Sequence, residues 1–201
     1  MIDASTVAVL VLGAGEGSRY ADGDKLGVML NGLPVAHHVL NMLQGFRWGA
    51  KILTCRTQSS EQTTWIQGYA RQGFEIAVVE EPETGMLGSL HRGLRAVKDQ
   101  SHVLICLADM PLVPAVHIER LLAAHHRIKA PVIASRSQTY RGPPALCVPD
   151  YLRTLPENGE GGARSLLTEA GFVEMDDPAF CDIDTVHDFE KVRQILQSNS
   201  G

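Results

Sequence analysis

The segment Val7-Ala-Val-Leu-Val-Leu12-Gly-Ala-Gly-Glu-Gly-Ser-Arg19 decides the fold of this chain. Its first half is a continuous apolar run, the pattern of a strand buried on both faces of a parallel sheet. The glycines after Leu12 end that strand. Further apolar runs follow, and segments with helical periodicity separate them; the runs lie at 51–55, 75–79, 103–107 and 132–135. This alternation predicts an α/β fold with a mostly parallel sheet and helices on both faces.

The regular alternation changes after residue 136. The predicted helices before that point lie at 35–44, 61–72, 88–97 and 115–126. Beyond it we expect a strand at Ala145–Val148, a short helix at Ala163–Ala170, a last strand at Cys181–Ile183 and a closing amphipathic helix at Phe189–Leu196. No linker or internal repeat divides the chain, so a single domain over 1–201 is predicted.

Composition and charge exclude several classes of protein. The 201 residues are 44% hydrophobic and 20% charged, with a formal net charge of -5. These values exclude a disordered chain, and the negative charge argues against a nucleic-acid partner. No apolar run reaches the roughly 18 residues that span a bilayer. The N-terminus also lacks the basic region of a signal peptide, so we expect a cytoplasmic protein with no membrane partner.

The glycine-rich segment after the first strand predicts phosphate binding. Gly13, Gly15 and Gly17 let backbone N–H groups approach a phosphate, and the nearby cations Arg19 and Lys25 would neutralise its charge. The segment is not a P-loop, because no Gly-Lys-Ser/Thr sequence closes it. Nor is it a dinucleotide fingerprint, because Ser18 stands where the third glycine belongs. The alternative is an ordinary glycine-rich turn between a strand and a helix.

Two acidic segments predict a metal site. Asp109 ends an apolar run and precedes Met110-Pro111, which places a carboxylate at the end of a sheet where α/β proteins bind ligands. Mg²⁺ prefers such carboxylates together with substrate phosphates. In the expected last strand, alternation puts Asp182 and Asp184 on one face, and either could join Asp109 around the metal. The alternative for Asp109 is a loop or capping role. The alternative for the last segment is an edge strand that carries polar residues, with Asp184 or Thr185 as the N-cap of the last helix.

A third segment, Glu81–Leu90, lies between an expected strand and an expected helix. Gly85 and Ser89 offer backbone and hydroxyl groups that could contact a base. The alternative is an irregular loop with a helix cap.

In order along the chain, these segments resemble one family, the MobA-like NTP transferases, and most closely the molybdenum cofactor cytidylyltransferases. Leu12-Gly-Ala-Gly-Glu-Gly-Ser-Arg19 with Asp24-Lys25-Leu26 resembles the signature Leu-Ala-Ala-Gly-x-(x)-Ser-x-Arg…Lys-Leu. Further similarities lie in Gly85-Met-Leu-Gly-Ser-Leu90, Leu107-Ala-Asp-Met-Pro-Leu112, Arg141-Gly-Pro-Pro144, Gly159-Glu-Gly-Gly-Ala-Arg164 and Asp182-Ile-Asp-Thr185. The resemblance extends from residue 7 to about residue 192.

The resemblance implies a fold and roles for individual residues. It implies a single Rossmann-like three-layer domain of the nucleotide-diphospho-sugar transferase type, with about 1–135 binding the NTP and about 136–201 binding the acceptor and ending in the C-terminal helix. The implied catalytic residues are Arg19, Lys25 and Asp109, and the implied Mg²⁺ ligands are Asp109 and Asp184. The implied nucleotide-binding residues are Leu12, Gly13, Ala14, Gly15, Gly17, Ser18, Arg19, Lys25, Gly85 and Ser89, and the acceptor-binding residues are Arg141, Gly142, Gly162 and Arg164.

The resemblance also implies a reaction, the transfer of CMP from CTP to the terminal phosphate of a phosphorylated pterin, the molybdopterin cofactor. Pyrophosphate would leave, and the product would pass to molybdenum hydroxylase apoenzymes or their maturation factors. Several positions depart from the family pattern: Gly13 replaces Ala, Pro143 replaces His, Glu160 replaces Asp and Val186-His187 replaces Pro-Glu. Guanylyl transfer, transfer to a sugar phosphate and a non-catalytic nucleotide sensor remain as alternatives.

Overall fold

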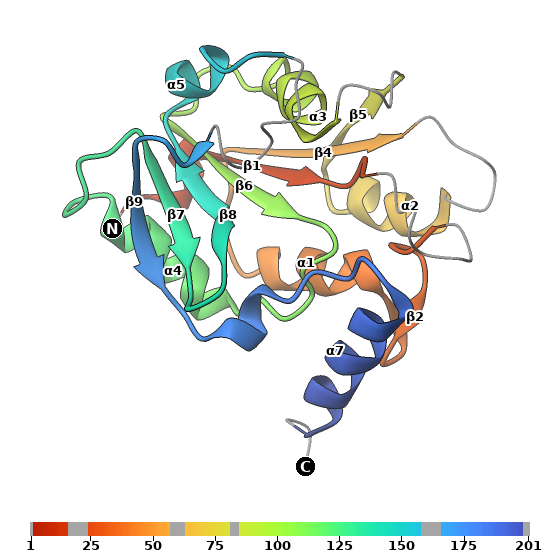
Figure 1. Cartoon of the computed structure of the whole chain (residues 1–201). Coiled ribbons are helices and arrows are strands. Elements are labelled where there is room, and N and C mark those ends of the chain that lie inside the picture. Colours follow the sequence, from red (N-terminus) through yellow and green to blue (C-terminus); the bar gives the residue numbers. More distant parts are fainter. Residues whose placement is uncertain (1, 16–23, 57–62, 81–84, 158–165, 199–201) are drawn as a thin grey trace.

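The computed structural model describes residues 2–15, 24–56, 63–80, 85–157 and 166–198. Its centre is a seven-stranded sheet in the order β5-β4-β1-β6-β8-β7-β9 (Figure 1). The strands are β1 (Val7–Leu12), β4 (Ala50–Arg56), β5 (Glu75–Val79), β6 (His102–Leu107), β7 (Val132–Arg136), β8 (Arg141–Cys147) and β9 (Ala170–Glu174). Only β8 runs antiparallel to its neighbours in this sheet of the described residues. The predicted α/β fold with a mostly parallel sheet is confirmed.

The apolar run that opens the sequence forms the middle strand. All six residues of β1 are buried. Leu10 pairs with Ile52 of β4 on one side and with Ile105 of β6 on the other. A strand that is covered on both faces and paired on both edges has no place for a polar side chain, which is why this run is continuous rather than alternating.

Helices cover both faces of the sheet, giving three layers. One face packs against α1 (Val35–Leu43), α2 (Thr63–Arg71), α4 (Ala115–Ala124) and α7 (Val186–Ser198). The other face packs against α3 (Gly85–Leu94) and α5 (Pro149–Arg153). A short hairpin of β2 (Met29–Leu30) and β3 (Leu33–Pro34) and two 3₁₀ turns, η1 (Ala4–Thr6) and η3 (Asp177–Phe180), complete the described elements. None of the helices described is long and apolar enough to cross a membrane.

Three sequence-based predictions in the second half of the chain are wrong. Residues Cys181–Ile183 form no strand but an extended segment that crosses the end of β6, where the Ile183 backbone N donates to the Asp109 backbone O at 3.0 Å. The strand β9 was missed because Ala170, its first residue, ends a segment with helical periodicity. The strand β8 begins four residues earlier than predicted and runs through Gly142-Pro143-Pro144, whose composition indicates a break.

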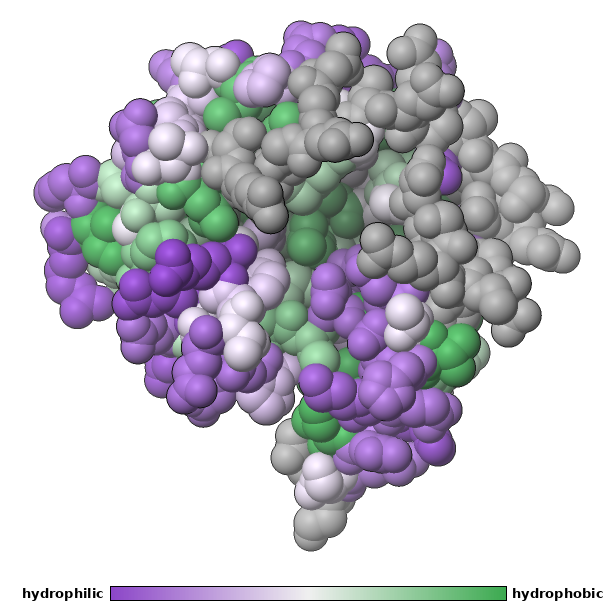
Figure 2. Space-filling model, viewed as in Figure 1, coloured by the Kyte–Doolittle hydropathy of each residue, from purple (hydrophilic) through white to green (hydrophobic). Residues whose placement is uncertain are grey.

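The described surface is mostly hydrophilic on the face shown in Figure 2, and hydrophobic patches are small and separated. The strongest hydrophilic band lies over the ends of β7, β8 and β9. The four cysteines form no disulfide, and Cys106 and Cys147 are buried in the two cores on either side of the sheet.

Candidate active site

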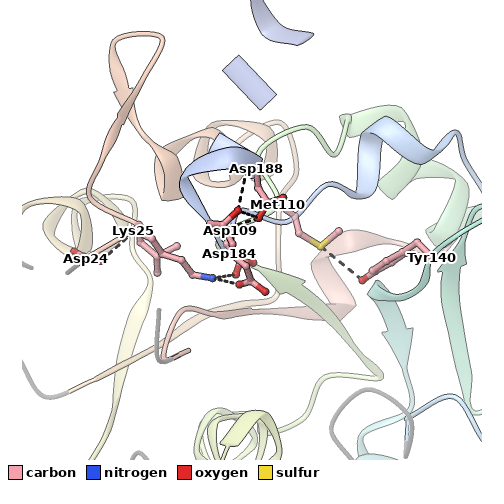
Figure 3. Close-up of polar contacts among 9 residues, drawn as sticks. Asp24, Lys25, Asp109, Met110, Tyr140, Asp184 and Asp188 are labelled. Atoms are coloured by element: carbon pink, nitrogen blue, oxygen red, sulfur yellow. Dashed lines mark hydrogen bonds and ion pairs between the residues drawn. The ribbon is translucent and has the colours of Figure 1, made fainter. Parts of the chain in front are cut away.

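Lys25 lies between two carboxylates from distant parts of the chain. Its Nζ atom donates to Asp109 Oδ2 at 2.7 Å and to Asp184 Oδ1 at 2.7 Å (Figure 3). The lysine side chain is only 7% exposed, whereas the Asp184 carboxyl is 44% exposed and gives the cluster its access to solvent. The structure therefore brings together three of the residues that the sequence predicts for catalysis and metal binding.

The sheet places Asp109 beside the glycine turn. Asp109 follows β6 by two residues, and β6 pairs with β1 along its whole length. The Ala108 backbone N donates to the Leu12 backbone O at 3.0 Å, which extends this pairing to the point where the glycines begin. The carboxyl ends of neighbouring parallel strands are where α/β folds bind ligands, so the cluster occupies the position expected for a substrate site.

The crossing segment, with α7 behind it, places Asp184. The Ile183–Asp109 backbone hydrogen bond fixes this segment over β6. The cap of α7 is made by Thr185, whose backbone N and Oγ1 donate to Asp188 Oδ2 at 2.8 and 2.7 Å, while the Asp188 backbone N donates to Thr185 Oγ1 at 3.2 Å. This reciprocal cap leaves Asp184 with its Oδ1 on Lys25. Of the two residues expected as alternatives for the helix cap, Asp184 and Thr185, it is Thr185 that makes this cap.

The charges of the cluster shift the pKa values of its members. Burial lowers the pKa of Lys25, but the negative charges of Asp109 and Asp184 outweigh this effect and hold the pKa above its ordinary value of 10.5. Lost hydration and the charges of Asp109 and Asp184 raise the pKa of Asp182. Asp182 therefore lies close enough to be affected by the same negative charges, although of Asp182 and Asp184 it is Asp184 that accepts the hydrogen bond from Lys25.

The surroundings of one carboxylate oxygen, Asp109 Oδ1, indicate whether the cluster fits a metal ion. Asp109 Oδ1 is buried and has no hydrogen-bond partner among the described residues. An unsatisfied buried oxygen costs about 1–3 kcal/mol, and a hard cation is one species that would remove this cost. No group of three or more His, Cys, Asp or Glu side chains within the described ranges is arranged to hold a metal by itself. Asp109 and Asp184 therefore fit an ion that takes its remaining ligands from substrate and water, as Mg²⁺ does.

The predicted nucleotide-binding residues are placed in part. Leu12 ends β1, and the Gly13 backbone N donates to the Thr54 backbone O at 2.9 Å. The Ala14 backbone O accepts a hydrogen bond from Arg56 Nε at 2.9 Å, and a Cβ on Gly15 would meet only open space. Gly17, Ser18 and Arg19 lie outside the described residues. Their roles stay predictions.

The predicted base and acceptor residues lie at the same edge of the sheet. Gly85 begins α3 with a φ of 61°, a conformation that favours glycine, and Ser89 is buried with its hydroxyl donating to the Gly85 backbone O at 3.2 Å. Arg141 and Gly142 begin β8, next to the end of β6. Gly162 and Arg164 lie outside the described residues, so nothing tests their predicted contact with an acceptor.

Sequence reasoning missed Tyr140, which contacts both β8 and the residues that follow β6. Its Oη donates to the Pro143 backbone O at 2.6 Å and lies 3.8 Å from the Met110 Sδ atom, while its ring stacks on Phe180 with the centroids 5.0 Å apart. Burial, together with the charges of Asp182 and Asp109, raises the pKa of Tyr140, so its hydroxyl remains a donor at neutral pH. Its place directly before Arg141-Gly-Pro-Pro144 was the available sequence signal.

This combination of fold and site defines a class of protein. A parallel sheet with a glycine turn after β1, and a lysine held between carboxylates at the strand ends, is an arrangement suited to the transfer of phosphate-linked groups. A model of the MobA-like NTP transferase domain matches residues 9–175. The chain belongs to this family of nucleotidyltransferases, as its sequence motifs indicate.

The curated proteins that match by sequence are distant relatives, and they include molybdenum cofactor guanylyltransferases and a bifunctional protein GlmU. The chain is 27% identical over 151 residues to the molybdenum cofactor guanylyltransferase of Shewanella sp. strain W3-18-1, covering 74% of this chain and 72% of that protein. It is 24% identical over 201 residues to the Histophilus somni strain 2336 protein of the same name, covering 96% and 98%. It is also 30% identical over 127 residues to the bifunctional protein GlmU of Rhizorhabdus wittichii, covering 62% of this chain but spanning only 27% of that protein.

Solved structures share the fold over nearly the whole chain. A nucleotidyl transferase from Methanothermobacter superimposes with a TM-score of 0.79 at 18% identity, covering 96% of this chain and 98% of that one. Rv0371c from Mycobacterium tuberculosis, in complex with manganese, superimposes with a TM-score of 0.72 at 18% identity, covering 94% and 98%. At these identities the likeness shows the fold, which is that of the nucleotide-diphospho-sugar transferases.

The first prediction concerns the pH dependence of the lysine cluster. Because the folded-state pKa of Lys25 lies above 10.5, its ion pairs stabilise the fold fully below pH 10.5, and this contribution is lost as the pH rises through the folded-state value. We expect Lys25→Met to lower the free energy of unfolding by about 1–3 kcal/mol at pH 8, less than for a fully buried pair because Asp184 is partly exposed.

The measurement is urea unfolding of both proteins at several pH values between 8 and 11. The difference between parent and Lys25→Met should shrink above pH 10.5. Lys51→Met is the control, since Lys51 Nζ donates to the Gln72 backbone O and touches no carboxylate among the described residues. A Lys25→Met difference that stays constant up to pH 11 would contradict the charge-pair account.

Proposed function

We propose that this nucleotidyltransferase transfers CMP from CTP to the terminal phosphate of the molybdopterin cofactor, in the cytoplasm, and releases pyrophosphate. The observation that carries the proposal is the contact of Lys25 with both Asp109 and Asp184 beside the glycine turn. The names of the curated relatives support molybdenum cofactor chemistry. Molybdenum hydroxylase apoenzymes or their maturation factors would receive the product.

The reaction needs little covalent help from the protein. An oxygen of the acceptor phosphate attacks the α-phosphorus of CTP, the new P–O bond forms, and the bond to the β-phosphate oxygen breaks as pyrophosphate leaves. Catalysis of this kind rests on positioning and on fixed charge. Lys25 lies where it can place its ammonium against the α-phosphate and the leaving group, because its turn faces the strand ends that carry the glycines and Asp109.

Asp109 and Asp184 are the side chains that would hold Mg²⁺. When bound, the ion supplies positive charge that stabilises the charge developing on the triphosphate. Asp109 is suited to this role by its unsatisfied buried Oδ1, and Asp184 by its exposure to solvent. Lys25 must then share its carboxylate partners with the ion, which would free its ammonium to contact phosphate.

The preference for CTP rests on Ala14. The cytidylyltransferases that this chain resembles carry Ala where the guanylyltransferases carry a second glycine. Ala14 is 6% exposed, and its backbone O is bound by Arg56, so the methyl group cannot easily turn away from its neighbours. A methyl group here would narrow the pocket beside the base and favour a pyrimidine. The second candidate is guanylyl transfer, which the names of the relatives from Shewanella and Histophilus favour.

A competition assay decides between the two nucleotides. With equal CTP and GTP and the molybdopterin cofactor as acceptor, we expect the cytidine dinucleotide to form at least about tenfold faster, since one methyl group in a pocket is worth about 1–3 kcal/mol. Ala14→Gly should weaken this preference. A product that is mainly the guanine dinucleotide from the parent enzyme would move the protein to guanylyl transfer.

Asp109→Asn tests the metal assignment. The variant keeps the shape of the side chain but removes half of the charge that would hold the ion, so we expect pyrophosphate release to fall by a factor on the order of 10². Asp150→Asn is the matched control, because Asp150 is exposed on α5 and its ion pair in the described part of the chain is with Arg153. Release by Asp109→Asn within threefold of the parent, with Mg²⁺ saturating, would show that Asp109 is not a metal ligand.

A further inference from the structure

Trp65 of α2 lies between the glycine turn and the turn that carries Lys25. Its side chain is buried, and its Nε1 donates to Asp24 Oδ2 at 2.7 Å. Asp24 Oδ1 accepts from the Leu26 backbone N at 3.2 Å, and the Asp24 backbone O accepts from the Gly27 backbone N at 3.1 Å. Asp24 therefore closes the turn around Lys25 and ties that turn to the indole.

The other end of the same indole packs against the glycine turn. A Cβ added to Gly13 would lie 3.1 Å from Trp65 Cη2 and 3.1 Å from the Thr54 backbone O. Both distances are tighter than ordinary van der Waals contact, and the buried ring and the strand backbone have little room to move. This contact gives a physical reason why glycine stands at position 13, where the signature that the chain resembles has alanine.

One ring thus contacts both parts of the site that would hold the triphosphate. The ring itself is held by further contacts, since the Trp65 backbone O is bonded to His37 Nε2 at 2.8 Å and the indole meets the Tyr69 ring edge-on at 6.1 Å. A rigid aromatic group fixed at both ends sets the distance between the elements that it touches.

We propose that Trp65 is a positioning residue for nucleotidyl transfer, which holds Lys25 at a fixed place relative to the glycine turn. The inference rests on the role proposed for Lys25. Small displacements of a catalytic charge slow the chemical step more than they weaken binding. Loss of the Nε1 donor should therefore lower kcat and leave the KM for the nucleotide nearly unchanged.

The chain offers a matched control because it has two tryptophans. Trp65→Phe keeps an aromatic ring and removes the donor. Trp48→Phe does the same at a buried residue beyond the end of α1, whose Nε1 donates to the Leu43 backbone O at 2.9 Å rather than to a residue of the Lys25 turn. We expect Trp65→Phe to lower kcat about tenfold with KM for CTP within twofold, and Trp48→Phe to leave both within twofold. Equal losses of kcat in the two variants would overturn the proposal.

A double-mutant cycle tests the coupling through Asp24. If Trp65 acts through Asp24, then kcat of Trp65→Phe/Asp24→Ala is no lower than that of Asp24→Ala alone. Hydrogen exchange gives a readout that needs no activity: amides of 24–28 should exchange about tenfold faster in Trp65→Phe and at the parent rate in Trp48→Phe. The inference would be contradicted if the kcat losses of Trp65→Phe and Asp24→Ala multiplied in the double variant. It would also be contradicted if the exchange rates of amides 24–28 were the same in Trp65→Phe and the parent. If the parent protein showed no nucleotidyl transfer but the amides exchanged as expected in the two variants, only the proposed function would be contradicted.

A second and independent feature is a pair of arginines that share one phenyl ring. Arg136 at the end of β7 and Arg141 at the start of β8 are register partners. Their guanidinium carbons lie 5.3 and 5.7 Å from the centre of the Phe172 ring of β9. Like charges placed directly opposite across strands repel each other, so this arrangement costs stability unless something negative offsets it.

Only part of this positive charge is balanced. Arg136 forms an ion pair with Glu174, whose side chain is 72% exposed, and no carboxylate among the described residues pairs with Arg141. The two arginines lie at the same edge of the sheet as Asp109. The strand β8 lies between β6 and β7 and runs antiparallel to both, so its start is beside their ends, and neighbouring strands are about 4.8 Å apart.

We propose that Arg136 and Arg141 form a binding subsite for a phosphate group of the acceptor, with Glu174 as an internal competitor for Arg136. The identity of the ligand, a phosphate of the acceptor, rests on the proposed function. A guanidinium stacked on a ring keeps its N–H edges available, and these edges match phosphate oxygens in pairs.

The probe is inorganic phosphate, followed through the side-chain Nε–H NMR signals of the arginines at constant ionic strength. We expect the Arg136 and Arg141 signals to shift together, with the Kd rising at least fivefold in Arg136→Gln, as read on Arg141, and falling in Glu174→Gln. Arg153→Gln on α5 is the control and should change nothing. No shift, or the same Kd in all variants, overturns the subsite. If the Kd values change as expected but the KM for the molybdopterin cofactor does not, the subsite stands and its proposed ligand is wrong.

Discussion

The burial of one ammonium group between two carboxylates is the interaction that the rest of the site depends on. Lys25, Asp109 and Asp184 come from a turn after the glycines, the end of β6 and the segment before α7. A lysine buried without partners would lose the free energy of its hydration, so these three segments are stable only when they are assembled together. The sheet order, which puts β6 beside β1, is what allows this assembly.

The same interaction leaves the site with an excess of negative charge. One lysine contacts two aspartates, and burial together with the charges of these aspartates raises the pKa of the nearby Asp182. A bare triphosphate would be repelled here, whereas a triphosphate that brings a divalent cation would be attracted. The unsatisfied Asp109 Oδ1 adds a local reason for a cation. Charge balance thus links the nucleotide, the metal and Lys25 in one site.

The sequence predicted the parts of this site that depend on local patterns. A continuous apolar run followed by glycines indicates a central parallel strand, and an apolar run ending in Asp109 indicates a strand whose end faces a ligand. The contact between Lys25 and Asp184 spans 159 positions, and residue alternation alone left Asp182 and Asp184 equal, so that only the family resemblance implied Asp184. That choice depends on the reciprocal cap between Thr185 and Asp188 and on the backbone bond from Ile183 to Asp109.

Other features were invisible because they arise between elements. Trp65 has the pattern of an ordinary core residue of an amphipathic helix, and only the fold shows that its donor meets Asp24. The strand β9 was missed because its pairing with β7 outweighs a local preference for helix at Ala170. Position 13 was noted as a departure from the family pattern, but its cause lies in a ring contributed by another element.

The most direct measurement is the single-turnover rate of nucleotidyl transfer by Lys25→Met compared with the parent, with the dissociation constant of the nucleotide measured on both. If the buried ammonium acts on the charge that develops at the α-phosphate, the rate should fall by a factor on the order of 10² or more, while the dissociation constant changes by less than about fivefold. A rate within threefold of the parent, or a loss that saturating nucleotide restores, would contradict the account.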